Sequence, residues 1–340
     1  DLRLSRGLGD VYKRQEMVLT ITHNGYIKRT SLSTYRSQRR GGRGVQGASS
    51  RDEDFVEHLF VANTHSYILF FTDKGKCYWV KVYDIPEGGR AAKGRAIVNL
   101  IGCEPDEKVS AFISVKEFHE DHFVVMATEK GIVKKTKLSA YSNPRKKGIY
   151  AVEIRDGDRL IEARVSTGDN DILLGTRNGK SIRFSEEQIR PSGRKTMGVK
   201  GITLSSEDDR LVGMLLIKRE GTTVLVATEK GFGKRTEISQ YRAQKRGGKG
   251  VLTMKTTEKV GKMVTIKEVV DKDDLMIITN QGVLIRQPVA QIRAIGRATQ
   301  GVKLIKLGEG TLVSSITRIM TEEEKKEDGE ESNSEKPSEG

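Results

Sequence analysis

One pattern recurs six times along the chain and limits what it can fold into: an apolar run that ends in a short turn and a glycine. A second glycine follows each first one after 17 or 19 residues. Successive copies are 48 to 56 residues apart. The first glycines are Gly25, Gly75, Gly131, Gly179, Gly231 and Gly282, and the second are Gly44, Gly94, Gly148, Gly198, Gly250 and Gly301. Two registers that hold over six copies indicate a repeat architecture, and the repeat decides the fold class.

Each copy has the composition of short β-strands. Asn24-Gly25 and Asn178-Gly179 lie between runs of branched and aromatic residues, which is typical of a hairpin because the turn requires a positive φ. A further apolar run closes each unit, at 55–61, 109–115, 160–165, 211–217, 260–266 and 312–319. Propellers repeat at about 40–50 residues and hide their sheet edges by radial packing. The sequence therefore predicts an all-β fold, a six-bladed β-pinwheel or propeller-like ring of four-stranded repeats.

The two ends of the chain lie outside the repeats. Residues 1–15 match no copy, and we expect a disordered leader or a scar of cloning or assembly there. Residues 321–340 contain nine acidic and three basic residues and no aromatic or branched apolar residue, which predicts a disordered acidic tail. The remaining residues, 16–320, are expected to form the six-bladed domain.

The net charge is strongly positive and points to a polyanionic partner. The chain has 60 Lys and Arg against 46 Asp and Glu, a formal charge of +14, although its acidic tail contributes −6. Such an excess favours attraction to nucleic acid or to an anionic membrane surface.

A run of about 18 apolar residues, as a membrane span requires, does not occur. Cys77 and Cys103 fit neither a disulfide framework nor a metal-binding knuckle. We therefore expect a cytoplasmic protein without a metal site or a membrane span.

Basic residues recur at two positions of the repeat. The hairpin set stands three or four residues after the first glycines and comprises Lys28, Arg29, Lys134, Lys135, Arg183, Lys234, Arg235 and Arg286. The loop set flanks the second glycines and comprises Arg39, Arg40, Arg43, Arg90, Lys93, Arg95, Arg145, Lys146, Lys147, Arg194, Lys195, Lys245, Arg246, Lys249 and Arg297. In a ring, equivalent positions share one rim, so both sets predict a curved cationic stripe. The alternative, that they are ordinary solvated or edge-protecting residues, is disfavoured by the six-fold recurrence.

The ligand that fits a long curved stripe is double-stranded DNA, held through its phosphates without a sequence code. Few aromatic residues accompany the basic loops, which argues against single-strand binding by base stacking. Bending is the expected energetic cost, on the order of 1–6 kcal/mol for 20–30 bp bent by 40–90°. Many phosphate contacts must therefore act together.

The first copy carries a heptad with three arginines and three glycines: Gln38, Arg39, Arg40, Gly41, Gly42, Arg43 and Gly44. Glycine allows close approach to a phosphate, and arginine offers a planar fork for its oxygens. This heptad resembles the GyrA box of the DNA gyrase A subunit family, and the resemblance extends over about residues 16–320. It implies a C-terminal β-pinwheel that bends and wraps duplex DNA with positive handedness. Within whole gyrase, the wrap would support ATP-dependent negative supercoiling.

The same resemblance implies what this chain lacks. In the family, the catalytic tyrosine and arginine belong to the upstream part of the A subunit, and the metal-binding acidic cluster belongs to the B subunit. We expect no catalytic residue, cofactor or metal in this chain, whereas the whole enzyme needs ATP and Mg. The implied partners are DNA, the B subunit, and the catalytic N-terminal part of the A subunit, in an A2B2 enzyme at the bacterial nucleoid. The isolated domain is expected to be a monomer.

The fifth copy departs from the family pattern. It repeats the heptad as Gln244-Lys245-Arg246-Gly247-Gly248-Lys249-Gly250, with lysine in two of the three arginine positions. Lysine binds phosphate as a point charge without the fork. We therefore expect the first loop to dominate and the fifth to be auxiliary. Two alternatives stay open: the corresponding domain of topoisomerase IV, and a propeller scaffold for protein partners.

Overall fold

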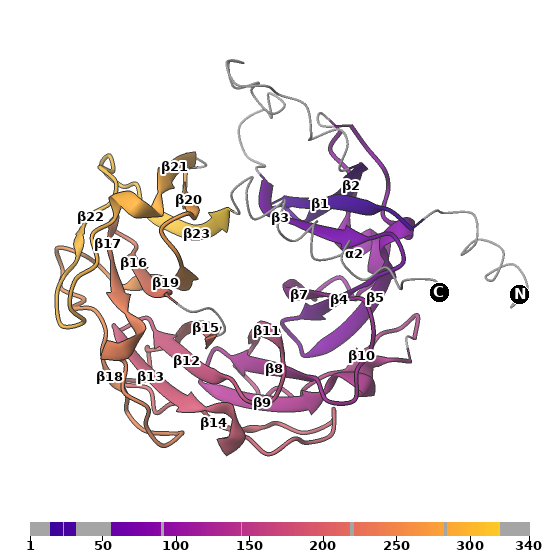
Figure 1. The fold of residues 1–340 in the computed structure, drawn as a ribbon, viewed down its shortest axis with the longest axis horizontal. Coiled ribbons are helices and arrows are strands. Elements are labelled where there is room, and N and C mark those ends of the chain that lie inside the picture. Colours follow the sequence, from indigo (N-terminus) through magenta and orange to yellow (C-terminus); the bar gives the residue numbers. More distant parts are fainter. Residues whose placement is uncertain are drawn as a thin grey trace, which may run out of the picture.

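The described part of the chain consists of six antiparallel sheets arranged one after another around an arc (Figure 1). A computed structural model describes residues 14–22, 24–31, 56–89, 92–143, 145–217, 221–281 and 284–319. The predicted ring of six β-blades is confirmed. The first and the sixth sheet end the arc, and β23 (Val313–Ile319) of the sixth lies beside β3 (Val56–Asn63) of the first.

The six sheets share one strand pattern. The first contains β1 (Glu16–Thr22), β2 (Tyr26–Ser31), β3 and β6 (Arg95–Ala96). The second contains β4 (Tyr67–Thr72), β5 (Lys76–Lys81), β7 (Val109–Val115) and β10 (Ile149–Tyr150). The third contains β8 (Phe123–Thr128), β9 (Ile132–Lys137), β11 (Leu160–Ser166) and β14 (Val199–Lys200).

The remaining sheets continue this pattern. The fourth contains β12 (Asp171–Thr176), β13 (Lys180–Ser185), β15 (Leu211–Ile217) and β18 (Val251–Leu252). The fifth contains β16 (Thr223–Thr228), β17 (Phe232–Glu237), β19 (Met263–Val269) and β22 (Val302–Lys303). The sixth, within the described residues, contains β20 (Asp274–Thr279), β21 (Leu284–Pro288) and β23.

Helical structure is short and lies between the strands. The helix α2 (Ile97–Ile101) follows β6, and single 3-10 turns follow the second hairpin strands at Val82–Asp84, Leu138–Tyr141, Glu186–Gln188, Ile238–Gln240 and Val289–Gln291.

The fourth strand of each of the first five sheets is contributed by the following repeat. β18, for example, lies in the fifth repeat but pairs with β13 of the fourth sheet, with Lys180 opposite Leu252 and Ser181 opposite Val251. The third strands of the second to sixth sheets contact one another in succession along the inside of the arc. The exchanged strands β10, β14, β18 and β22 lie on the outer rim, away from the centre of the arc (Figure 1). Each sheet is thus tied to its successor by backbone pairing.

The hairpin turns explain the first glycine of each repeat. In the fourth sheet the connection is three residues long, and the Gly179 N–H donates to the Thr176 carbonyl at 3.0 Å with φ at +84°. A Cβ at Gly179 would lie 2.1 Å from the Met254 carbonyl oxygen, which belongs to the next repeat. Both the turn and the neighbouring chain therefore require glycine here.

The core lies between the sheets, so that the first strand of each hairpin is largely buried on both faces. All six residues of β16 are buried, and so are five of the six in β8 and β12. Val125 of the third sheet packs in one cluster with Ile172, Leu174 and Phe184 of the fourth. This two-sided burial explains why the sequence shows continuous apolar runs and not strict alternation.

Candidate nucleic-acid interface

Loops on the outer rim lead into the exchanged strands and end at the second glycines. At Gly250 the φ angle is +70°, and a Cβ would lie 2.4 Å from the Ser181 carbonyl oxygen. This close approach lets the chain enter β18 directly beside β13. The rim loops are therefore set by backbone geometry at a position where no other residue fits.

These rim loops carry most of the exposed cations that the sequence predicted there. The exposed members of the loop set are Lys93, Arg95, Arg145, Lys146, Lys147, Lys195, Lys245 and Lys249. They follow the outer edge of the second to fifth repeats. The heptad 38–44 and Arg90 lie outside the described residues, so their predicted roles stay predictions.

Three arginines of the loop set bridge successive rim loops. The guanidinium of Arg194 donates to the Tyr150 carbonyl at 3.3 Å, that of Arg246 to Lys200 at 2.6 Å, and that of Arg297 to Leu252 at 2.9 Å. In each case the acceptor is the last residue of the exchanged strand in the preceding repeat. These half-buried side chains, which we call the arginine latches, therefore hold one rim loop to the next.

The near-copy of the heptad in the fifth repeat shows how such a loop is built. The Gly247 N–H donates to the Gly201 carbonyl at 2.8 Å, and the Thr203 N–H donates to the Gly248 carbonyl at 2.9 Å. Arg246 is held further by Gln188, whose side-chain oxygen accepts its backbone N–H at 2.8 Å. The loop is thus fixed by its glycines and its arginine, while Lys245 and Lys249 are exposed to solvent.

The structure corrects the prediction for the hairpin set, because six of its eight side chains are buried inside the protein. These are Lys28, Arg29, Lys134, Lys135, Lys234 and Arg235. The other two form ion pairs, Arg183 with Asp171 and the more exposed Arg286 with Asp274. The hairpin set therefore does not form part of an open cationic surface. The residues of this set lie in strands that are packed on both faces. The basic residues in these strands gave no sign of this burial in the sequence.

The buried members of the hairpin set bind carbonyl oxygens and carboxylates of adjoining loops. Arg29 donates to the Ile85 carbonyl at 2.7 Å, Arg235 donates to the Ile292 carbonyl at 2.6 Å, and Lys135 pairs with Glu186 at 2.8 Å. Burial, and secondarily the positive charge of Arg194, lowers the pKa of Lys134 to about 7. Burial followed by the charge of Arg297 lowers the pKa of Lys234 to about 8. These buried basic side chains therefore bind and position the loops of the rim and are not available to an external ligand.

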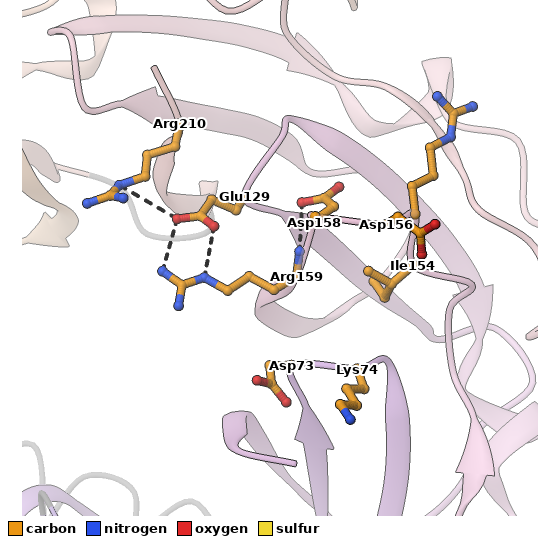
Figure 2. A pocket seen from close by; sticks show the side chains of 10 residues that line it. Asp73, Lys74, Glu129, Ile154, Asp156, Asp158, Arg159 and Arg210 are labelled. Carbon is orange, nitrogen blue, oxygen red and sulfur yellow. Dashed lines mark hydrogen bonds and ion pairs between the residues drawn. The ribbon is translucent and has the colours of Figure 1, made fainter. Parts of the chain in front are cut away.

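A mixed-charge pocket of about 740 Å³ opens near the hairpin turns of the second and third sheets (Figure 2). Arg159 pairs with Glu129 at 2.9 Å, and Arg210 approaches the same carboxylate at 3.6 Å. Asp158 accepts the backbone N–H groups of Lys130 and Arg159. Glu129 thus joins two arginines, and Asp158 holds the turn at Lys130, so these carboxylates serve the turns of the sheets.

The described residues hold no cluster of three or more His, Cys, Asp or Glu that could bind a metal ion. His119 and His122 lie with ring centroids 5.0 Å apart on a connection between sheets, and His122 contacts Asp121. Within the same part of the chain, none of the helices is long and apolar enough to span a membrane.

Taken together, the strand exchange, the six sheets and the basic outer loops define a six-bladed β-pinwheel domain with a cationic rim. A family model described as "DNA gyrase C-terminal domain, beta-propeller" matches residues 16–63, 66–116, 122–167, 170–218, 222–269 and 273–319. The chain belongs to this family, the C-terminal domains of the DNA gyrase A subunit.

Curated relatives agree with this assignment. The A subunit of DNA gyrase from Staphylococcus epidermidis is 47% identical over 317 residues, which is 93% of this chain and 35% of that protein. The same subunit of Staphylococcus aureus strain MRSA252 is 46% identical over 331 residues, or 97% of this chain and 37% of that protein. The chain therefore spans about a third of the length of these relatives.

Solved structures share the fold. The C-terminal domain of DNA topoisomerase IV superposes with a TM-score of 0.81 at 25% identity, over 95% of this chain and 99% of that one. The DNA gyrase A C-terminal domain gives a TM-score of 0.71 at 23% identity, over 90% and 100% of the two chains.

Proposed function

We propose that this domain binds double-stranded DNA without sequence preference, along its outer rim. The observation that carries the proposal is the recurrence of exposed lysines and arginines on rim loops of successive repeats. Phosphate contacts of this kind supply affinity and are strongly dependent on salt. An affinity for duplex DNA whose logarithm falls only shallowly with the logarithm of salt, at a slope weaker than about −3, would contradict a rim-wide contact.

The duplex would bend around the rim and wrap it with positive handedness. The exposed cations stand in loops that lead into the exchanged strands, and the labelled exchanged strands lie on the convex side of the arc (Figure 1). A straight duplex could therefore reach only a few of these cations at once. Each additional phosphate that bending brings to a cation offsets part of the deformation energy. The heptad 38–44 would dominate this interaction, as the family resemblance implies, and the loop 244–250 would add to it.

In the whole enzyme, this wrap would present a DNA segment for strand passage. We infer that the domain acts with the B subunit, and with the catalytic N-terminal part of the A subunit, in an A2B2 gyrase. ATP hydrolysis and Mg²⁺ binding would reside in those parts, and this chain would be a non-catalytic, monomeric DNA-binding module. Its place of action would be the bacterial cytoplasm, at the nucleoid.

A ligation experiment tests the wrap directly. The 340-residue chain is incubated with nicked circular DNA, the nick is sealed by ligase, the protein is removed, and the linking-number distribution is measured. We expect a positive shift that grows with protein concentration. The variant Arg39→Ala/Arg40→Ala/Arg43→Ala should lose the shift while its circular dichroism spectrum stays that of the folded domain. Loss of folding in this variant would instead make the heptad structural.

The same experiment separates the alternatives. Binding without any shift would reduce the function to a DNA tether, which is the outcome expected for the topoisomerase IV alternative. The TM-score of 0.81 to the topoisomerase IV domain is consistent with that alternative. Absence of binding at low salt would reject DNA as the ligand and would favour the protein-scaffold alternative.

A further inference from the structure

The rim loops belong to two alternating classes, and the difference begins with the residue beneath each loop. This residue stands three positions after the first glycine and is buried or half-buried in the described structure. In the odd-numbered sheets it is a lysine: Lys28, Lys134 and Lys234. In the even-numbered sheets it is Tyr78, Ile182 and Ile285. The identity of this residue therefore alternates between successive sheets, with a period of two repeats.

Each of the three buried lysines binds the loop above it through backbone carbonyl oxygens. The Lys28 ammonium donates to Gly89 at 3.0 Å and to Ala92 at 2.8 Å. Lys134 donates to the Arg194 carbonyl of its loop, and also to the Ala151 carbonyl at 2.7 Å, which lies outside that loop. Lys234 donates to the Gly296 carbonyl at 2.7 Å, to that of Arg297 and to the Thr299 hydroxyl. We call the described residues of 85–94 and the loops 189–198 and 292–301, which lie over these lysines, the anchored loops.

The loops over an apolar or aromatic residue carry more exposed charge. We call 142–148 and 241–250 the box loops; they cover Tyr78 and Ile182. The exposed cations of the first are Arg145, Lys146 and Lys147, and those of the second are Arg242, Lys245 and Lys249. The heptad 38–44 lies outside the described residues and resembles the loop 241–250 in sequence. In contrast, the anchored loop 189–198 exposes two cations, and 292–301 exposes one.

Electrostatics gives a reason for the alternation. A buried ammonium repels every further positive charge that is placed on the loop above it. Arg194 and Arg297 show this effect, since each lowers the pKa of the lysine beneath its own loop, in addition to burial. An uncharged residue beneath the loop, such as Ile182, causes no such electrostatic repulsion with a cluster of lysines on the loop. The anchored loops are thus fixed in position but can hold few positive charges. The box loops can hold several positive charges close together.

We propose that the duplex makes its main phosphate contacts on the box loops, at every second sheet, and that the anchored loops between them act as spacers held by the buried lysines. This inference rests on the proposed function, because it assumes that the rim binds duplex DNA. It adds that the contacts come in separate clusters and are not spread evenly over the rim. Lys28, Lys134 and Lys234 are then positioning residues, which act through the loops that they hold.

Two variants with equal loss of charge test the proposal in the full chain. Lys245→Gln/Lys249→Gln removes two exposed cations from a box loop, and Arg190→Gln/Lys195→Gln removes two from an anchored loop. The affinity for a duplex of fixed length is measured as a function of salt. The box variant should weaken the slope of log K against log salt by roughly 2, since each phosphate contact contributes about 0.9. The anchored-loop variant should change the slope by less than about 0.5.

A second box variant, Arg145→Gln/Lys146→Gln, should reproduce the larger effect in another repeat, and circular dichroism checks that each variant is folded. Equal reductions in the two classes, or a larger one in the anchored loop, would overturn the proposal of clustered contacts while leaving DNA binding intact. Failure of the unaltered chain to bind duplex DNA at low salt would instead reject the proposed function itself. The two failures are therefore distinguishable.

Discussion

Lys134 shows how a basic residue can serve the interior of this domain. Its side chain is 1% exposed, and its pKa is lowered to about 7 by burial and by Arg194. In the unfolded chain the same group would keep its proton up to about pH 10.5. Between these two values the unfolded state binds more protons than the folded state, so the contribution of Lys134 to stability rises with pH.

We therefore expect Lys134→Met to abolish this rise. The free energy of unfolding, measured by urea denaturation, should increase from pH 7 to pH 9 by on the order of 1–2 kcal/mol more in the unaltered chain than in the variant. The matched control is Ile182→Met, which alters the equivalent position of the fourth sheet and should show the same pH dependence as the unaltered chain. If Lys134→Met followed the unaltered chain over this range, the lysine would be charged in the folded state at pH 9.

At the scale of the strand, the exchange between repeats leaves the sixth sheet different from the others. β17 pairs with β22 of the following repeat, with Phe232 opposite Lys303, whereas β21 has no fourth strand beside it within the described residues. Backbone N–H groups without a partner exchange their hydrogen quickly with solvent. We expect the amides at the start of β21 to exchange at least about tenfold faster than those at the start of β17, as measured by hydrogen–deuterium exchange with mass spectrometry. Equal protection would show that another segment covers the edge of β21.

The sequence was sufficient for the number of blades and for most strand positions, because the glycines mark turns that only glycine can form. It did not reveal which repeat donates the fourth strand, since exchanged strands such as Val251–Leu252 are only two residues long and show no periodicity. The closing strand expected at 260–266 lies at Met263–Val269, after the positive-φ turn at Gly261.

The same limit applies to the candidate site. Lys234 and Lys245 are both basic residues next to glycine-rich segments, yet the first is buried and the second exposed. Strands that are packed on both faces lack the alternation that would have distinguished them. The sequence signal that could have separated them is the period of two repeats, in which lysine alternates with Tyr78 and Ile182 at one buried position.

At the scale of the whole molecule, the proposed wrapping of DNA would depend separately on the shape of the rim and on its charge. The three latches, Arg194, Arg246 and Arg297, fix the spacing of successive loops through carbonyl contacts of 2.6 to 3.3 Å. Glutamine is shorter and uncharged, so Arg194→Gln/Arg246→Gln/Arg297→Gln should release the loops from one another. We expect this variant to retain duplex binding at low salt but to lose most of the linking-number shift per bound molecule in the ligation experiment.

The control for charge is Lys195→Gln/Lys245→Gln/Lys249→Gln, which also removes three positive charges but leaves the latches in place. It should bind more weakly as salt is raised, because it has lost phosphate contacts, and yet give the full shift per molecule once the DNA is saturated. If both variants lost the shift to the same degree at saturation, charge alone would account for wrapping. If only the latch variant loses it, the curvature that the DNA follows is built into the protein by contacts between its repeats, and the exposed cations supply the attraction that holds the duplex to that curve.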